Sequence, residues 1–215
     1  MKFQRFVSRV LSENCYALSD GGACVIVDPG FYFQEEVDGL LAWLDGTVPN
    51  AILLTHGHFD HTMGIKRLQA IWPDVPVYMH PADEAMLEED AKIVQRLDLP
   101  EADFSFRWTP AADGMLLQYG QLSFKAIATP GHSPGGIAFF CENPGEVNGQ
   151  KNVPPLLFPG DIIFAGSRGR SDLFGGDDHA LVSGIKSKLL TLPKETVVFP
   201  GHGPMTTIAD ESIWY

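Results

Sequence analysis

The sequence contains little cysteine and no long hydrophobic segment. Its three cysteines, Cys15, Cys24 and Cys141, are scattered and form no C-x-x-C pair, so we expect no disulfide framework and a reducing compartment. No apolar run is long enough to span a bilayer, and the N-terminus lacks the apolar stretch of a signal peptide. These features predict a cytoplasmic protein that is not inserted in a membrane.

Basic residues are also scarce. The chain has 15 Lys and Arg against 27 Asp and Glu, which gives a formal net charge of -12. This charge repels a polyanion, and no cluster of Lys and Arg offsets it locally. Nucleic acid is therefore not an expected partner, and a small molecule is.

The order of the expected secondary structure predicts a layered domain. A chain of 215 residues with 45% hydrophobic content can form one packed domain over residues 1–215. Strands are expected at 3–11, 15–19, 23–27, 51–54, 75–79, 121–128, 137–141, 156–158 and 196–199, helices at 35–45, 61–72, 82–97 and 178–190, and a surface loop at 143–155. Strands and helices mix in both halves, which indicates an α/β or α+β domain with central sheets and outer helices.

Histidine and aspartate follow several of the predicted strands. His56 follows the run AILLT and His132 follows FKAIATPG, while Asp161 follows LLFPG and His202 follows TVVFPG. In α/β sheets the loops at the carboxyl ends of strands converge on one crevice, where sites are built. We therefore expect these side chains to lie close together although they are distant along the chain.

The segment T-H-G-H-F-D-H carries an H-x-H-x-D-H motif, formed by His56, His58, Asp60 and His61. Four ligands this close in sequence cannot all reach one ion at about 2.0–2.2 Å without strain, but they can serve two ions about 3.5–4 Å apart. His56 and His58 lie two residues apart in extended backbone and so point the same way. Asp60 and His61, at the start of the next helix, then face a second ion, and Gly57 lets the backbone approach closely.

One further histidine for each ion and one shared carboxylate would complete such a site. We expect His132 to complete the first ion's ligands, His202 to complete the second's, and Asp161 to bridge the two. An ion with an open position lowers the pKa of bound water to about 7 and supplies hydroxide for hydrolysis. We predict two divalent ions, zinc first and iron or manganese as alternatives, with Asp60 and Asp161 also serving catalysis.

Two further histidines are expected to be structural. His80 precedes a proline and has no potential ligands beside it. His179 follows two aspartates at the start of a predicted helix. Neither is included in the predicted metal site.

Four motifs together resemble the metallo-β-lactamase superfamily. They are H-x-H-x-D-H at 56–61, G-H-S-P-G at 131–135, G-D at 160–161 and G-H-G-P at 201–204, and they stand in the family's order over almost the whole chain. The resemblance implies an α/β fold of the αββα type, in which two facing mixed β-sheets carry helices on their outer faces. It also implies that Asp28, in V-D-P-G, supports the ligands without binding an ion; a simple turn is the alternative.

Within that superfamily the ligand set resembles the glyoxalase II group. Residues 166–173 and 175–177 are similar to short bacterial glyoxalase II-like hydrolases, whereas the true β-lactamases place another residue at the position of His61 and a cysteine at that of Asp161. The resemblance implies a thioesterase of the hydroxyacylglutathione hydrolase type that uses a metal-bridging hydroxide. The chain shows no counterpart of the helical C-terminal domain that helps longer enzymes hold glutathione, which leaves glutathione recognition open.

Arg168 and Arg170 are the candidates for binding an anionic thioester substrate. Arginine suits this role because its planar fork donates parallel hydrogen bonds to a carboxylate. For Arg170, pairing with Asp172 to rigidify the loop is the preferred alternative. For Arg168 both roles stay open.

Other activities share this scaffold. Persulfide dioxygenases use one iron, which by resemblance would be held by His56, His132 and Asp161. Lactonases use a very similar ligand set, and a non-catalytic metal-binding domain is a further alternative. Metal content separates the first from a dinuclear hydrolase, while the oligomeric state and the physiological substrate have no sequence signal.

Overall fold

The strands form two mixed six-stranded sheets in the computed structural model, which describes residues 1–97, 99 and 102–215. The first sheet has the order β1 (Lys2–Val7), β2 (Asn14–Asp20), β3 (Ala23–Val27), β4 (Ala51–Leu53), β5 (Val77–Met79) and β6 (Thr109–Pro110). The second has the order β14 (Thr206–Thr207), β13 (Val197–Pro200), β10 (Leu156–Gly160), β9 (Ile137–Cys141), β8 (Leu122–Ala128) and β7 (Leu116–Tyr119). The pairs from β3 to β6 and the pair β10–β13 are parallel, and the others are antiparallel.

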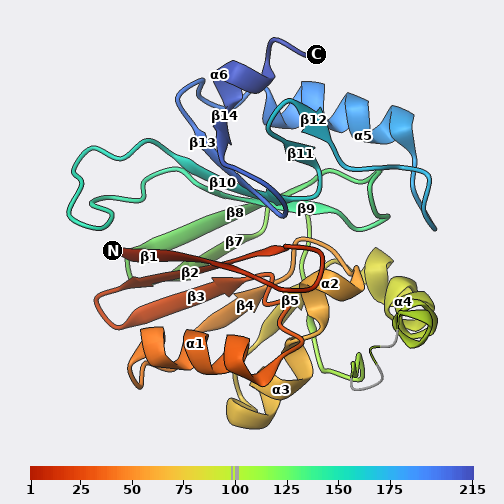
Figure 1. The fold of residues 1–215 in the computed structure, drawn as a ribbon. Coiled ribbons are helices and arrows are strands. Elements are labelled where there is room, and N and C mark those ends of the chain that lie inside the picture. Colours follow the sequence, from red (N-terminus) through yellow and green to blue (C-terminus); the bar gives the residue numbers. More distant parts are fainter. Residues whose placement is uncertain (98, 100–101) are drawn as a thin grey trace.

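Helices cover the outer faces of both sheets (Figure 1). Below the first sheet lie α1 (Gln34–Leu44) and α3 (Ile65–Ile71), and above the second lie α5 (Asp178–Gly184) and α6 (Ile208–Glu211). At one end of the sandwich, α4 (Glu84–Arg96) lies beside the short α2 (Phe59–Thr62). The predicted αββα arrangement is confirmed. None of the helices in the described part of the chain is both long and apolar enough to cross a bilayer.

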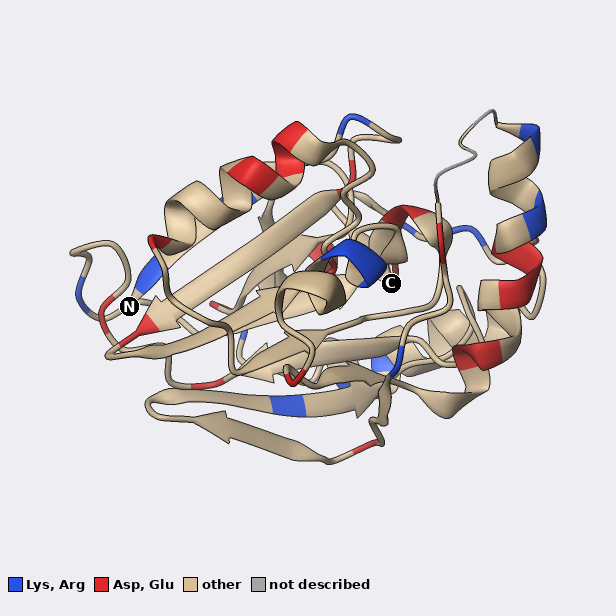
Figure 2. Cartoon of the chain, turned by 90° about the horizontal axis from the view of Figure 1, so that it is seen from below, with Lys and Arg blue, Asp and Glu red and all other residues tan. Residues whose placement is uncertain are grey.

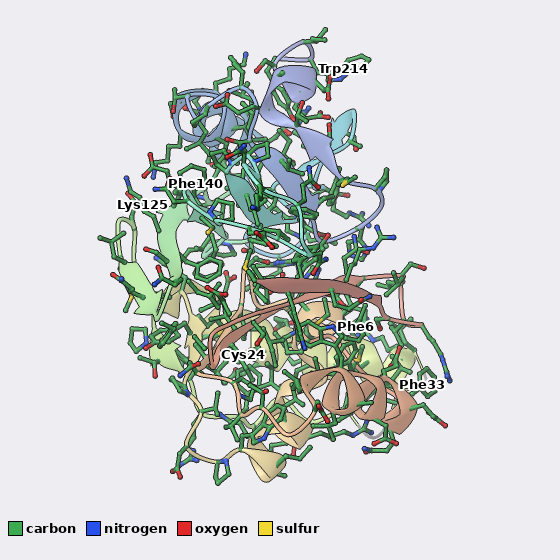
Figure 3. The ribbon with its side chains drawn as sticks, turned by 90° about the vertical axis from the view of Figure 1, so that its left-hand side faces the viewer. Phe6, Cys24, Phe33, Lys125, Phe140 and Trp214 are labelled. Carbon is green, nitrogen blue, oxygen red and sulfur yellow. The ribbon has the colours of Figure 1, made fainter. Side chains whose placement is uncertain are left out.

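Side chains that alternate between the two faces of each sheet form three hydrophobic layers, one between the sheets and one between each sheet and its helices. In β3, Val25 and Val27 face the space between the sheets, while Cys24 and Ile26 face α1 and α3. In β9, Phe139 faces the space between the sheets, and the intervening side chains pack toward the helices above. Figure 3 labels Cys24 in the lower layer and Phe140 in the upper one. Successive side chains point to opposite sides of a sheet. Since every residue of β3 and β9 is buried, both faces of these strands are covered.

Several predicted boundaries were wrong. The strand expected at 3–11 ends at Val7, where the chain turns back to β2: the Ser8 N–H donates to the Glu13 carbonyl at 2.8 Å, and Leu11 and Ser12 within this turn adopt left-handed backbone conformations. The helix expected at 61–72 is two helices, α2 and α3, since the Gly64 N–H donates to the Pro29 carbonyl at 3.1 Å and thereby leaves the helical pattern. The helix expected at 178–190 widens after α5 into a π-helical segment, η2 (Ile185–Leu189).

Other differences concern short elements. The helix expected at 82–97 begins as a 3₁₀ turn, η1 (Pro81–Asp83), before α4. The sequence did not predict β6, β7 or β14, nor the ribbon of β11 (Ile163–Phe164) and β12 (Ser167–Arg168). Most of these strands are two residues long, too short for alternation to be recognised.

The layer between the sheets predicts a strong dependence on its aromatic side chains. Phe139 is fully buried there, so Phe139→Ala should lower the free energy of unfolding by about 3–5 kcal/mol through lost burial and a residual cavity. Urea denaturation measures this. The control Leu116→Ala, at a side chain 70% exposed on the edge strand β7, should change it by less than about 0.5 kcal/mol; equal effects would contradict the layer assignment.

Candidate metal centre

The structure brings the seven predicted ligands together at the carboxyl ends of the strands. His56 and His58 follow β4, His132 follows β8, Asp161 follows β10 and His202 follows β13, while Asp60 and His61 lie on α2. Ligand atoms of His56, His58 and His132 lie within 4.8 Å of one another, and so do those of Asp60, His61 and His202. These are the two triplets expected from the H-x-H-x-D-H motif together with the histidines that follow later strands.

Asp161 lies between the triplets. Its Oδ1 is 3.4 Å from His61 Nε2, and its Oδ2 is 3.7 Å from His132 Nε2 and 3.6 Å from His202 Nε2. One carboxylate therefore reaches histidines of both groups. This is the position that a bridging ligand requires.

Unpartnered polar atoms indicate that the site is built for cations. Within the described residues, His56 Nε2, His61 Nε2 and Asp161 Oδ1 are buried without any hydrogen-bond partner. Leaving such atoms unpaired costs free energy in a folded protein. His58 Nδ1 and His132 Nε2 also lie only 2.9 Å apart, close enough to share an ion. The donor set of imidazole and carboxylate fits zinc, iron or manganese.

The opposite ring nitrogens of these histidines are held by the protein. His132 Nδ1 lies 2.7 Å from the Arg170 carbonyl, and His202 Nδ1 lies 3.1 Å from the Leu11 carbonyl. A carbonyl only accepts, so each Nδ1 carries a hydrogen, and in the neutral ring Nε2 is the nitrogen whose lone pair is available to an ion. The fold therefore fixes both the orientation and the tautomer of these rings.

Asp28 supports the ligands from behind, as the family resemblance implied. Its Oδ2 lies 3.1 Å from His61 Nδ1 and accepts a 2.6 Å hydrogen bond from Thr55 Oγ1. Thr55 Oγ1 in turn lies 3.0 Å from His56 Nδ1. Because Thr55 Oγ1 donates its hydrogen to the carboxylate, it accepts one from His56 Nδ1. The Nε2 atoms of His56 and His61 therefore have no hydrogen-bond partner in the protein. Asp28 thus orients one histidine of each triplet.

Asp83 joins the two ligand loops and was not predicted. Its buried carboxylate accepts hydrogen bonds from Gly57 N at 2.9 Å, Ser133 Oγ at 2.9 Å and Gly135 N at 2.5 Å. A β-carbon at Gly57 would lie 3.0 Å from Asp83 atoms, and one at Gly135 would lie 2.8 Å from them. Glycine is needed at both positions so that the backbone can approach this carboxylate. Asp83 therefore ties the loop of His56 and His58 to that of His132.

The electrostatics of the two triplets differ. Burial first, and neighbouring histidines second, lower the pKa of His56 well below its usual value and that of His58 to about 3. Burial also disfavours protonated His61 and His202, but Asp60 and Asp161 outweigh it and raise both pKa values. Burial would raise the pKa of Asp60 and Asp161, yet His61 holds both below the usual value. Without cations, His56 and His58 therefore favour the neutral imidazole, whereas His61 and His202 favour the protonated one.

The remaining predicted residues lie outside the two triplets. Arg170 pairs with Asp172 through bonds of 2.7 and 2.8 Å, the alternative preferred from the sequence, and Arg168 pairs with Asp178 at 2.9 Å. His80 Nδ1 accepts from the Ala82 N–H at 3.2 Å, which makes it a cap of η1, as a structural histidine would be. His179 is exposed in the first turn of α5.

The Asp83 contacts predict a loss of metal affinity on substitution. Asp83→Asn places an amide where three donors converge, so one N–H or O–H loses its acceptor and the two loops separate. Metal affinity should fall about 10- to 100-fold, measured by competition with a chromophoric chelator. The exposed neighbour Glu84→Gln is the matched control, and wild-type affinity in Asp83→Asn would contradict the role.

The difference in pKa predicts that the two triplets differ in the pH at which they would release a metal ion. A protonated imidazole cannot bind a metal, and His61 and His202 have raised pKa values whereas His56 and His58 have lowered ones. As pH falls, protons therefore compete at the second triplet first. The variant His58→Ala, which keeps the second triplet, should release zinc at a higher pH than His202→Ala, which keeps the first. Zinc content after dialysis from pH 8 to pH 5 measures this, and the reverse order would refute it.

Curated relatives match almost the whole chain. The probable metallo-hydrolase YqgX of Bacillus subtilis is 33% identical over 98% of this chain and 94% of the relative. The hydroxyacylglutathione hydrolase GloC of Haemophilus influenzae is 32% identical over 93% of this chain and 89% of the relative. Both relatives are named as hydrolases, and the first is named as a metallo-hydrolase.

Solved structures and a family model give the same result. TTHA1623 in a di-iron-bound form has a TM-score of 0.80 at 36% identity and covers 97% of this chain and 96% of its own. The B3 metallo-β-lactamase BLEG-1 has a TM-score of 0.83 at 32% identity and covers 98% and 96%. The model of the metallo-β-lactamase superfamily matches residues 8–202. The chain therefore belongs to the metallo-β-lactamase superfamily of metal-binding hydrolases.

Proposed function

We propose that this hydrolase is a dinuclear thioesterase with the reaction type of glyoxalase II. The observation that carries the proposal is the pair of ligand triplets with Asp161 between them. They lie at a cavity of about 560 Å³, large enough for a small-molecule substrate. The similarity to a hydroxyacylglutathione hydrolase supports the reaction class.

The two triplets would hold one cation each, with Asp161 bound to both. Zinc is the proposed metal, and the di-iron form of TTHA1623 makes iron the first alternative. Bound cations supply a water of lowered pKa and polarise the scissile carbonyl. His56 and His61 are more deeply buried than Asp161 and His202, so the ions would be reached from the side of the latter pair.

Asp60 and Asp161 place acceptors for the attacking water at the open side. Asp60 Oδ2 lies 3.1 Å from His202 Nε2, and Asp161 Oδ2 lies 3.6 Å from the same nitrogen. Both aspartates line the cavity and have lowered pKa values, so each is an ionised acceptor that can orient the hydrogens of a water molecule. In the reaction, water adds to the carbonyl carbon and the C–S bond breaks to give an acid and a thiol.

The leaving group explains why a thioester fits this site. A thiol has a pKa of about 8.5, so its sulfur leaves as a thiolate without a strong proton donor. Apart from the proposed ligands, the titratable residues that line the described cavity are Glu89, Asp90 and Arg170. Glu89 pairs with Lys92 at 2.6 Å, and Asp90 Oδ2 is buried without a partner among the described residues; a thiolate leaving group requires neither carboxyl as a proton donor.

The free cysteines support a reducing compartment. Cys15, Cys24 and Cys141 are all buried thiols, and burial raises the pKa of each. Disulfides are rare where thiols are kept reduced. We propose the cytoplasm as the location.

Metal analysis with parallel assays tests the proposed function. Protein prepared without chelator should contain two ions per chain and hydrolyse S-lactoylglutathione faster than a simple lactone or a β-lactam. Oxygen consumption with glutathione persulfide is measured alongside. One iron per chain together with oxygen consumption would replace the hydrolase by a dioxygenase, and preferred lactone or β-lactam cleavage would replace the thioester.

Removal of the shared carboxylate should abolish the activity. Asp161→Ala leaves both triplets without their common ligand, so kcat/KM for the thioester should fall at least about a hundredfold, the upper range for residues that only orient a ligand. Metal content should fall in parallel. The exposed Asp38→Ala on α1 controls for the loss of one negative charge, and full activity in Asp161→Ala would place the site elsewhere.

A further inference from the structure

One face of α4 forms a wall of the metal cavity. Met86, Glu89, Asp90 and Ile93 all line the cavity, and their helical spacing places them on the same side of the helix. Figure 1 shows α4 beside α2 at the end of the sandwich where the ligands gather. The wall therefore begins directly next to the two triplets and runs outward from them.

Apolar side chains from three other segments complete this cavity. Phe164 comes from β11, Leu173 and Phe174 follow β12, and Leu11 follows β1. Leu11, Leu173 and Phe174 are 59%, 38% and 57% exposed, although they are large and hydrophobic. Exposed apolar side chains gathered around one opening indicate a surface that is covered when a ligand binds.

Positive charge is scarce in the same cavity. Of the lining residues in the described part of the chain, Arg170 is the basic one, and Asp172 already occupies its fork. Arg168 is engaged by Asp178 in the same way. An anionic peptide would therefore find no uncompensated guanidinium at the cavity.

The wall formed by α4 carries acidic groups instead. Figure 2 shows red acidic bands in the first part of α4 and blue basic ones near its end. Glu89 lines the cavity and pairs with Lys92 at 2.6 Å, and burial raises the pKa of Asp90 to about 7. Both titratable groups that the wall presents are carboxyls, so it offers a substrate carboxylate no positive partner. Glutathione carries two of them.

We propose that the substrate is a thioester with an uncharged apolar arm of several carbons beside the scissile bond, in place of an anionic glutathionyl group. The arm lies along Ile93, Phe164 and Phe174, while the carbonyl faces the two triplets. This inference rests on the proposed thioesterase reaction. It adds that apolar burial, and not pairing with arginine, supplies the binding energy.

Two substrate series test the proposal, one that lengthens the acyl side of the thioester and one that varies its thiol side. The acyl series is acetyl, butanoyl, hexanoyl and octanoyl N-acetylcysteamine, and the thiol series is the lactoyl thioester of glutathione, N-acetylcysteamine and hexanethiol. On one side of the thioester, either the acyl or the thiol side, kcat/KM should rise about threefold for each added methylene until the cavity is filled. Values that do not change with length in either arm, or a glutathione thioester hydrolysed best, would overturn the proposal.

Variants connect the length dependence to the named wall. Ile93→Ala and Phe174→Ala should each lower the ratio of kcat/KM between octanoyl and acetyl substrates by about tenfold or more, because each removes several buried carbons. Leu116→Ala, which removes an exposed apolar side chain outside the metal cavity, should leave the ratio unchanged. An unchanged ratio in both wall variants would refute the assignment.

Binding to metal-free protein separates this inference from the proposed function. Calorimetry with unhydrolysed hexanoyl and acetyl N-acetylcysteamine should show about tenfold or more tighter binding of the longer chain, lost in Phe174→Ala. If the loaded enzyme hydrolyses no thioester but this difference is found, the reaction is wrong and the apolar site stands. Equal binding of both chains refutes the apolar site whatever the activity.

Discussion

The structure around the metal centre depends on one electrostatic constraint, the burial of imidazoles and carboxylates in a small volume. His61 is fully buried between Asp28, Asp60 and Asp161, and its Nε2 has no hydrogen-bond partner. Unpaired buried polar atoms are costly, and a cation bound by several of them removes that cost. Metal binding and the stability of this end of the sandwich are therefore linked, since ligation releases protons held by His61 and His202 and satisfies the unpaired atoms.

The sheets turn this constraint into a defined geometry. Asp28, at the end of β3, fixes His61 directly and His56 through Thr55. Asp83, before α4, joins a loop of the first sheet to a loop of the second. Each carboxylate thus acts on ligands that come from different segments, and together they hold both triplets before an ion arrives. Such orientation limits the reorganisation that metal binding and catalysis require.

The negative charge of the chain influences which molecules can approach the cavity. The chain has a formal net charge of -12, and the cations would offset part of the negative charge at the cavity floor. Beyond that floor, the cavity offers apolar side chains from α4 and from the loop after β12, and its arginine is already paired. In the proposed thioesterase, the chemistry at the metals and the selection of the substrate would therefore be carried by separate parts of the cavity, the strand ends and the surrounding loops and helix.

The sequence by itself determined a layered domain and the two triplets, because alternation along the strands, the H-x-H-x-D-H spacing and the positions of His132 and His202 after predicted strands are local patterns with direct geometric consequences. It also indicated Asp28, but only through the family resemblance. Tertiary structure alone decided the roles of Asp83 and of the Leu11 and Arg170 carbonyls, since every residue has a carbonyl and a single aspartate gives no sign of its partners. It likewise broke the expected helix 61–72 at Gly64, where contact with the Pro29 carbonyl outweighed local helical preference. Contacts between segments distant in sequence leave no local periodicity, and for that physical reason the supports of the site and the walls of its cavity could be found only in the folded molecule.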